Sequence, residues 1–395
     1  MTDEISPRFI KGLQANIAYW QQQTAHLADA RIPEINPDFP NMLRAVQMGL
    51  LHETTRVETA VLVSQVFFWV EQAGHWDSWL PIMERLIPML DDEALCCQLY
   101  KQQGQLLRSG RQLDAAIPFL EKSAEIAKKL KDELAVAEAE THLCSVYLQK
   151  RAFVEAESFG QRALKCLVQR PEAKRQLTAV LTNLGLVALA QGAFDQAEAQ
   201  LTEAAAIGRA VQQPTQMARI LNSLAIALHQ LGKLEASQQA FEEALALIEQ
   251  TAGHIDKVRL QLSLGALYVD MKRHDDAETL FLEAEKTLQK VPGYLPLRAM
   301  IANNLGNVLL EKGQPAAAEH YLHRSVELRR QLKIRLPLAN SYKSWGQALY
   351  QLNRVDEALA AMDAALQILP EFPDDKWAKK LLQECVTLRD TFNAK

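Results

Sequence analysis

The side chains best suited to chemistry in this sequence are a few histidines. His320 and His323 lie three residues apart, so on a helix they share one face, where two imidazoles can hold a metal ion. No third ligand lies near them in the sequence, so we expect no metal site. His229 and His274 are single histidines; we expect His229 to point into the ligand groove described below and His274 to be structural.

Sequence motifs for catalysis are missing. We find no Ser-His-Asp order, no nucleophile elbow and no pair of carboxylates placed for acid-base chemistry. A phosphate-binding loop needs G-x-x-x-x-G-K-[ST], but Gly232-Lys233 is followed by leucine, with no second glycine at the required distance. The sequence therefore predicts a protein that is not an enzyme, does not hydrolyse nucleotides and has no cofactor.

Composition limits the partners and the compartment. The net charge of −5 gives no electrostatic basis for binding nucleic acid or an anionic membrane. The five cysteines show no metal-ligand spacing, and their odd number favours reduced thiols. No N-terminal signal segment is recognisable, and the longest apolar stretch, around residues 66–70, is too short to span a bilayer. We expect a cytoplasmic protein without nucleic-acid or membrane partners.

A repeat of about 40 residues organises most of the chain. Its marker is a small residue that recurs at intervals of 40, 41, 40, 40, 41 and 40: Gly104, Cys144, Gly185, Ala225, Gly265, Gly306 and Gly346. Twelve residues after each marker comes Ala116, Ala156, Ala197, Ser237, Ala277, Ala318 or Ala358. Seven residues further on come Ser123, Ala163, Ala204, Ala244, Ala284, Ser325 and Ala365. Small residues at such positions let two antiparallel helices approach closely, so we predict stacked helix pairs.

The turn inside each predicted pair also has a signature. It carries Gly192, Gly232, Gly313 or Asn353, residues that tolerate positive φ at a helix end. Together these residues resemble the tetratricopeptide repeat, whose eighth, twentieth and twenty-seventh positions are small. The usual period is about 34 residues, so this chain is similar to a variant with longer helices. The resemblance covers about residues 97–370 and implies an all-α fold, a right-handed superhelical solenoid of antiparallel helix pairs.

Three regions follow from this repeat. We predict an N-terminal helical segment with a degenerate repeat over residues 1–95, seven repeats over 96–370, and a C-terminal capping helix with a polar outer face over 371–395. The prolines of residues 31–40 predict an extended connector, and Asn41 is placed to cap the helix after it. Outside the repeats, helices are expected over residues 5–29, 41–52, 56–72, 76–90 and 376–392. The third of these is apolar on nearly every face, which predicts burial on both sides.

The N-terminal segment has a more particular resemblance. The run Phe39-Pro40-Asn41-Met42-Leu43-Arg44-Ala45, followed by an apolar helix, a glycine turn, Trp76 and Trp79-Leu80, resembles the start of a known helical region. That region is the sensor of bacterial signal-transducing NTPases of the STAND class. Because this chain lacks the phosphate-binding loop, the resemblance implies an isolated sensor or a free-standing relative of such a sensor.

The resemblance to tetratricopeptide repeats also implies where a ligand binds. In that family the first helices line a concave groove, and the residues six and three before the marker and one, four and five after it point inward. The asparagines at these positions suit a peptide backbone, and the cations suit carboxylates. The candidates carried over are Arg219, Asn222, His229, Arg259, Asn303, Asn307, Asn340, Lys343 and Tyr350. Repeats two and three are more apolar at these positions, with Leu148, Leu186 and Leu189, and this patch alternatively belongs to a core beneath the N-terminal helices.

Three interpretations of the function remain open. The first is a sensor or adaptor that binds a protein or peptide in the groove. The second is a peptide-responsive regulator, because the layout is similar to Rap-type quorum-sensing regulators, which grip a response-regulator partner with N-terminal helices. Against it, the N-terminal segment here shows no acidic or amide-rich catalytic face. The third is a scaffold that forms a homo-oligomer through its end repeats.

Overall fold

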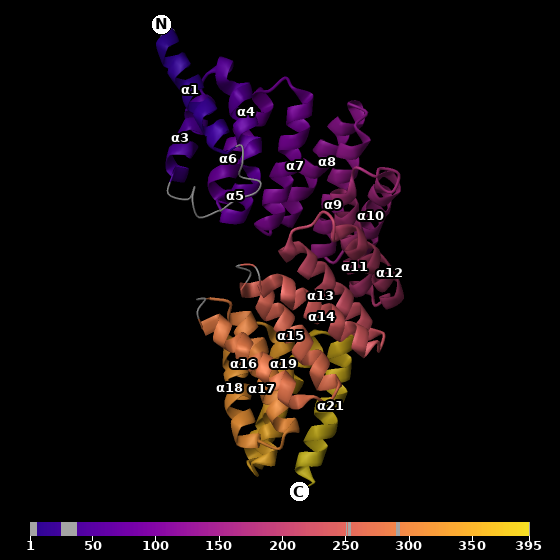
Figure 1. Ribbon diagram of the computed structural model, residues 1–395. Helices are drawn as coiled ribbons and strands as arrows, with labels where there is room; N and C mark the ends of the chain where they lie inside the picture. The colour runs from indigo at the N-terminus through magenta and orange to yellow at the C-terminus, as the bar shows by residue number, and fades with distance from the viewer. Residues whose placement is uncertain (1–5, 25–37, 250, 252–253, 290–292, 395) are drawn as a thin grey trace. The chain divides into compact units, whose positions relative to one another are not determined.

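The computed structural model describes residues 6–24, 38–249, 251, 254–289 and 293–394, apart from the side chain of Gln72. All the regular secondary structure in these residues is helical (Figure 1). The chain divides into two compact units, Met1–Val211 and Gln212–Lys395, hereafter unit 1 and unit 2. In each unit successive helices pack against one another along the chain, as an all-α solenoid requires.

Unit 1 begins with five helices that precede the regular pairs. They are α1 (Pro7–Thr24), α3 (Phe39–Gly49), α4 (Arg56–Gln65), α5 (Phe67–Ala73) and α6 (Trp76–Leu86), with 3₁₀ turns at Glu53–Thr55 and Ile87–Met89. Three pairs follow: α7 (Glu93–Ser109) with α8 (Leu113–Lys129), α9 (Glu133–Gln149) with α10 (Phe153–Leu167), and α11 (Lys174–Gln191) with α12 (Phe194–Gly208).

Unit 2 contains four further pairs and a last helix. The pairs are α13 (Pro214–Gln230) with α14 (Leu234–Glu249), α15 (His254–Asp270) with α16 (His274–Gln289), α17 (Leu295–Glu311) with α18 (Pro315–Gln331), and α19 (Arg335–Gln351) with α20 (Val355–Ile368). A 3₁₀ turn at Leu369–Glu371 leads to α21 (Lys376–Asn393).

The small residues of the repeat mark the closest approach of the two helices in a pair. A Cβ added to Gly265 of α15 would lie 2.3 Å from Cε1 of Phe281, and one added to Gly306 would lie 2.4 Å from Cγ of Leu322. Every residue of the other two small columns has an exposed fraction of 0%. The prediction of close-packed helix pairs is confirmed, because larger side chains at these positions would force the helices apart.

The turns confirm the predicted backbone conformation and extend it. Gly192, Gly232, Gly313 and Asn353 have φ values of 79°, 73°, 72° and 61°. The equivalent turns of the other pairs place Arg111, Arg151 and Lys272 in the same left-handed region, with φ of 60°, 61° and 61°. The turn geometry is therefore common to all seven pairs, although three of them carry a long side chain where glycine is favoured.

The N-terminal segment differs from the prediction in its helix boundaries. Helix α3 begins at Phe39, so Asn41 lies inside the first turn and is not the cap; Pro40 is tolerated there because first-turn amides need no helical partner. The predicted connector is wrong at Phe39 and Pro40, and the rest of it lies almost wholly outside the described residues. The helix predicted over 56–72 is two helices that meet at Val66, whose ψ is 0°.

The prediction that the apolar segment 56–72 is buried on both sides is only partly correct. Its core, which includes Leu62, Val66 and Trp69, is at most 1% exposed. Val61 and Phe68 are 42% and 40% exposed. The break at Val66 lets α4 and α5 contact α7 separately: Gln102 Nε2 of α7 donates to the backbone oxygen of Ser64 in α4 at 3.0 Å.

Helix α21 packs at the end of unit 2. Asp375 caps it, accepting hydrogen bonds from the backbone amides of Trp377 and Ala378 at 2.8 and 3.0 Å. The inner face buries Leu381 and Cys385. The outer face is not uniformly polar as predicted, because Trp377, Leu382 and Val386 are 45%, 36% and 43% exposed. Across the described parts of both units, no helix is long and apolar enough to cross a membrane.

Candidate ligand-binding surfaces

Two first helices of unit 2 bring three of the predicted groove residues together. Arg219 and Asn222 of α13 and Arg259 of α15 line a pocket of about 200 Å³. The helices are held side by side by a two-pronged ion pair, in which Arg219 Nη2 and Nε donate to the carboxylate of Asp256 at 2.7 and 3.2 Å. The pocket, hereafter the α13/α15 pocket, is completed by Ala218, Ser223 and Leu260.

The α13/α15 pocket offers one acceptor and one cation to a ligand. Oδ1 of Asn222 is buried and has no hydrogen-bond partner among the described residues. Arg259 is exposed and forms no ion pair with any described residue, whereas Arg219 is already neutralised by Asp256. A buried acceptor without a donor is unfavourable, so an N–H group from a ligand would relieve its cost.

Three other predicted residues contact neighbouring helices of the protein. His229 Nε2 lies 2.7 Å from Oδ2 of Asp270, which links α13 to α15. Lys343 Nζ of α19 donates to Glu384 of α21 at 2.7 Å. The Tyr350 ring stacks on Phe392 of α21, with the ring centroids 4.2 Å apart. These side chains fix successive helices against one another in the structure.

Asn303 departs from the predicted groove most clearly. It is 3% exposed, and its Oδ1 accepts hydrogen bonds from Ser341 Oγ at 3.0 Å and from Arg329 Nη1 at 3.4 Å. The predicted asparagine ladder is therefore incorrect at this position, because the side chain satisfies a buried guanidinium. Asn307 and Asn340 are half-buried, and neither lines the α13/α15 pocket.

A second pocket on first helices lies in unit 1, where the sequence predicted apolar groove positions. It has a volume of about 370 Å³ and is bordered by α5, α7, α9 and α11. Its lining is mostly polar: Phe67, Gln98, Lys101, Gln102, Gln105, Glu138, Thr141, His142, Arg175, Gln176 and Ala179. The same positions used for repeats four to seven would have found six of these residues, namely Gln98, Lys101, Gln105, Glu138, Thr141 and Ala179.

Polar contacts run from helix to helix across this pocket. Lys101 of α7 pairs with Glu138 of α9, which in turn accepts a hydrogen bond from Gln176 Nε2 of α11 at 2.9 Å. The amide of Gln105 contacts the imidazole of His142. Burial holds the pKa of His142 well below its usual range, and the nearby charges of Arg108 and Lys101 act in the same direction. His142 is therefore neutral at pH 7.

Metal binding finds no support in the described part of the chain. No group of three or more histidine, cysteine, aspartate or glutamate side chains is placed there to hold an ion. The His320 ring lies against Tyr321, and the His323 ring lies 5.0 Å from the Trp345 ring. Each of these two histidines therefore has an aromatic neighbour in the structure.

Comparison with known families agrees with the helix pairs. Residues 216–290 and 297–371 match the model of the tetratricopeptide repeat. The two matches cover α13–α16 and α17–α20, that is, all four pairs of unit 2. None of the curated proteins matches the chain. The match does not reach residues 39–80, so the resemblance of that segment to a STAND sensor remains a prediction.

Solved structures similar to this chain have the same architecture. The apo form of the quorum sensor NprR from B. thuringiensis is 16% identical, with a TM-score of 0.55 over 71% of this chain and 79% of that one. A Rap protein complexed with Competence and Sporulation Factor is 16% identical, with a TM-score of 0.54 over 87% and 99% of the two chains. Aspartyl phosphate phosphatase F from Bacillus subtilis is 14% identical, with a TM-score of 0.56 over 93% and 96%.

These observations define the class of protein. The chain is an all-α solenoid of helix pairs, and the pairs of unit 2 match the model of the tetratricopeptide repeat. At identities of 14–16%, the similar structures establish the fold and leave the ligand open.

Proposed function

We propose that this protein is a non-enzymatic module that binds a protein or peptide on the first helices of unit 2, as a sensor or adaptor in bacterial signalling or regulation. The observation that carries the proposal is the α13/α15 pocket. It gathers Arg219, Asn222 and Arg259, three of the groove residues implied by the tetratricopeptide-repeat resemblance, and leaves an acceptor and a cation available.

The chemistry of the pocket suits an extended peptide. Asn222 Oδ1 accepts a backbone N–H, which reads no sequence, and the Arg259 guanidinium binds a carboxylate from an acidic side chain or a chain terminus. Among proteins of this fold, one solved structure is described as NprR in complex with its cognate peptide NprX, with a TM-score of 0.51 at 15% identity. This precedent supports a peptide as the ligand class.

The test measures which partner proteins and which arrayed peptides the whole chain binds. Wild type is compared with Asn222→Ala/Arg259→Ala, using pull-down from the source organism's lysate and an array of random-sequence peptides. Gln239→Ala/Lys286→Ala is the matched control, because it removes one amide and one cation from exposed positions on α14 and α16. Thermal unfolding establishes that all three proteins are folded.

A partner or peptide that wild type and the control retain, and the pocket variant loses, supports the proposal. We expect the pocket variant to bind at least tenfold more weakly, since it loses one charge-assisted and one neutral hydrogen bond. Equal retention by both variants would place the function elsewhere and refute the proposed site.

The second candidate function is a regulator that binds a partner protein with its N-terminal helices. Phe9 and Tyr19 of α1 are 49% and 52% exposed and line a pocket of about 500 Å³ between α1 and α3. These exposed apolar side chains beside a pocket are the observation that supports this alternative. A partner lost by Phe9→Ser/Tyr19→Ser, and retained by the Asn222/Arg259 variant, would favour this function.

A separate observation supports the third alternative, a scaffold that self-associates. The three exposed apolar residues of α21, Trp377, Leu382 and Val386, leave an uncovered face at the end of unit 2. If a second copy covers them, the mass in solution rises with concentration, and Trp377→Ser restores the monomer. A monomeric mass at all concentrations would exclude the scaffold.

A further inference from the structure

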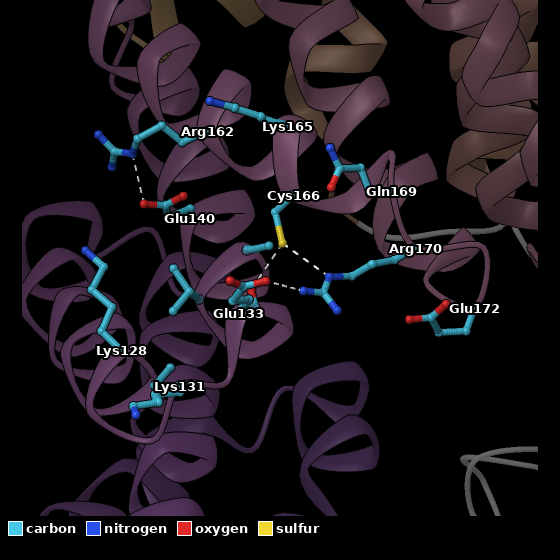
Figure 2. Close-up of a pocket in the computed structure, with 13 residues that line it drawn as sticks. Lys128, Lys131, Glu133, Glu140, Arg162, Lys165, Cys166, Gln169, Arg170 and Glu172 are labelled. Atoms are coloured by element: carbon cyan, nitrogen blue, oxygen red, sulfur yellow. Dashed lines mark hydrogen bonds and ion pairs between the residues drawn. The ribbon is translucent and has the colours of Figure 1, made fainter.

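A separate pocket of about 810 Å³ lies on the opposite side of α9 from the unit 1 first-helix pocket. It is bordered by the end of α8, the first half of α9, and the end of α10 with the loop after it (Figure 2). Its base includes Ala127, Val136 and Ala137, and charged side chains surround it. We call it the α8/α10 pocket; it plays no part in the function proposed above.

The charges of the α8/α10 pocket are predominantly positive. Five cationic side chains and three carboxylates line it, in a chain whose net charge is −5. Two carboxylates are already satisfied: Arg162 Nε donates to Glu140 at 2.9 Å, and Arg170 pairs with Glu133. Three exposed lysines remain without an ion pair among the described residues: Lys128, Lys131 and Lys165.

The cationic side chains lie on more than one side of the pocket. Figure 2 shows Lys128 and Lys131 on one side and Arg170 on the other, with Cys166 between them. Like charges gathered around one hollow repel one another and, in water, attract anions. Both arginines are engaged in ion pairs with glutamates, so the cations available to a ligand are the three lysines. Because lysine side chains are long and flexible and lie apart, the pocket suits several separate negative charges better than one compact phosphate.

This cluster is not required by the repeat. The residues equivalent to Lys165 in the other six pairs are Glu125, Ala206, Ala246, Lys286, Glu327 and Gln367. Those equivalent to Lys128 include Val168 and Glu249. Packing of the helix pairs therefore accepts neutral or acidic residues at these positions. The combination of Lys128, Lys131 and Lys165 does not recur at the equivalent positions of any other two successive pairs.

We propose that the α8/α10 pocket is a second binding site, which takes an acidic peptide segment of a partner protein. Lys128, Lys131 and Lys165 pair with its carboxylates, and its apolar atoms rest on Val136 and Ala137. Glu140 and Glu133 stay paired with Arg162 and Arg170, so two of the three lining carboxylates do not repel the ligand as free carboxylates would; Glu172 is the third, and the three lysines outnumber it.

The pocket contains its own reporter. Cys166 is half-buried, its Sγ lies 3.4 Å from Nε of Arg170, and it is the only cysteine of the five that is not buried. Burial raises the pKa of Cys144 to about 12 and that of Cys385 to about 11, so these thiols react slowly. A peptide in the α8/α10 pocket covers Cys166 and slows its alkylation.

The experiment uses fluorescein-labelled hexaglutamate with the whole chain. Binding is followed by fluorescence anisotropy at low and at physiological salt, and alkylation of Cys166 by iodoacetamide is followed by mass spectrometry. We expect Lys128→Gln/Lys131→Gln/Lys165→Gln to weaken binding about tenfold or more and to abolish the protection of Cys166. The matched control, Lys376→Gln/Lys379→Gln/Lys380→Gln on α21, removes the same charge from exposed positions in unit 2 and retains both effects.

Hexaglutamine, an uncharged peptide, and tripolyphosphate, a compact anion, are tested beside hexaglutamate as alternative ligands. Binding of hexaglutamate alone, lost in the pocket variant and kept in the control, supports the site. Three results overturn it: no binding of hexaglutamate to wild type, equal loss in both triple variants, or binding of tripolyphosphate in preference to the peptide. Asn222→Ala/Arg259→Ala must leave hexaglutamate affinity unchanged, which separates this site from the α13/α15 pocket.

Discussion

Asn303 and Arg329 are partners in the interior of unit 2: Oδ1 of the asparagine accepts a hydrogen bond from Nη1 of the arginine at 3.4 Å. Arg329 also donates to the backbone oxygen of Pro337 at 2.5 Å and to Ser341 Oγ at 2.7 Å. No carboxylate among the described residues pairs with it, and burial lowers its pKa to about 10. The guanidinium thus stays charged at pH 7 and depends on neutral acceptors from α17 and α19.

This relationship predicts that Asn303 stabilises the fold and does not contact a ligand. Asn303→Ala removes an acceptor from a buried charge and should lower the free energy of unfolding by about 2 kcal/mol. Asn307→Ala is the control, because Asn307 lies one turn away, is half-buried and makes no hydrogen bond with the described residues. Its expected change is under about 0.5 kcal/mol. Urea unfolding measures both, and equal changes would contradict the interior role of Asn303.

The same pair shows what repeat spacing can and cannot predict. The tetratricopeptide-repeat resemblance placed Asn303 on the inward face of a first helix, and in the structure its Oδ1 accepts a hydrogen bond from Ser341 on the next first helix. Asn303 does not face a ligand groove as predicted, because it contacts Arg329 of the second helix α18, a residue that is 7% exposed. No periodic rule predicts a buried arginine there, since the equivalent position in the preceding pair is Leu288.

The two units differ in how much of the site could be predicted. In unit 2 three of the residues carried over from the tetratricopeptide-repeat resemblance, Arg219, Asn222 and Arg259, line one pocket. The α8/α10 pocket could not be predicted from the groove rule, because it lies at helix ends, where Lys128, Lys131 and Lys165 come from two helices and a loop. Helix pairing was predictable because the small residues recur at a fixed interval. The break between α4 and α5 was not predictable, because the sequence around Val66 contains neither glycine nor proline.

The left-handed turn at Lys272 offers a stabilising substitution. Its φ of 61° costs an L-residue roughly 1 kcal/mol, which glycine avoids. Lys272→Gly should therefore raise the free energy of unfolding by about 0.5 kcal/mol, after the greater entropy of glycine in the unfolded chain is subtracted. Lys379→Gly, at an exposed position inside α21, should instead lower it by about 1 kcal/mol. Urea denaturation of both variants decides, and a loss of stability at Lys272 would contradict the turn conformation.

The contact between Gly265 and Phe281 predicts a large loss of stability. Because even a Cβ would meet Phe281 at 2.3 Å, Gly265→Val should lower the free energy of unfolding by about 3 kcal/mol. Phe281→Ala makes room for the new side chain, so the double variant should be more stable than the sum of the two single changes implies. Strict additivity in this double-mutant cycle would show that the two residues do not limit the approach of α15 and α16.

The neutral imidazole of His142 makes unit 1 sensitive to acid. Its pKa is lowered in the folded state, mainly by burial, so below about pH 6.5 the unfolded chain binds a proton that the folded chain resists. Stability contributed above that pH is then lost as the pH falls toward the folded pKa, with a slope of up to about 1.4 kcal/mol per pH unit.

His142→Gln removes this titration and keeps a polar group beside Gln105. The variant should lose less stability than wild type between pH 6.5 and 5.5, as measured by urea unfolding at each pH. His320→Gln, at an exposed position of α18, is the control and should follow wild type. Parallel pH profiles for wild type and His142→Gln would mean that the imidazole becomes protonated in the folded protein as readily as in the unfolded chain. The pocket formed by α7, α9 and α11 would then hold one more positive charge at acidic pH than its contacts indicate.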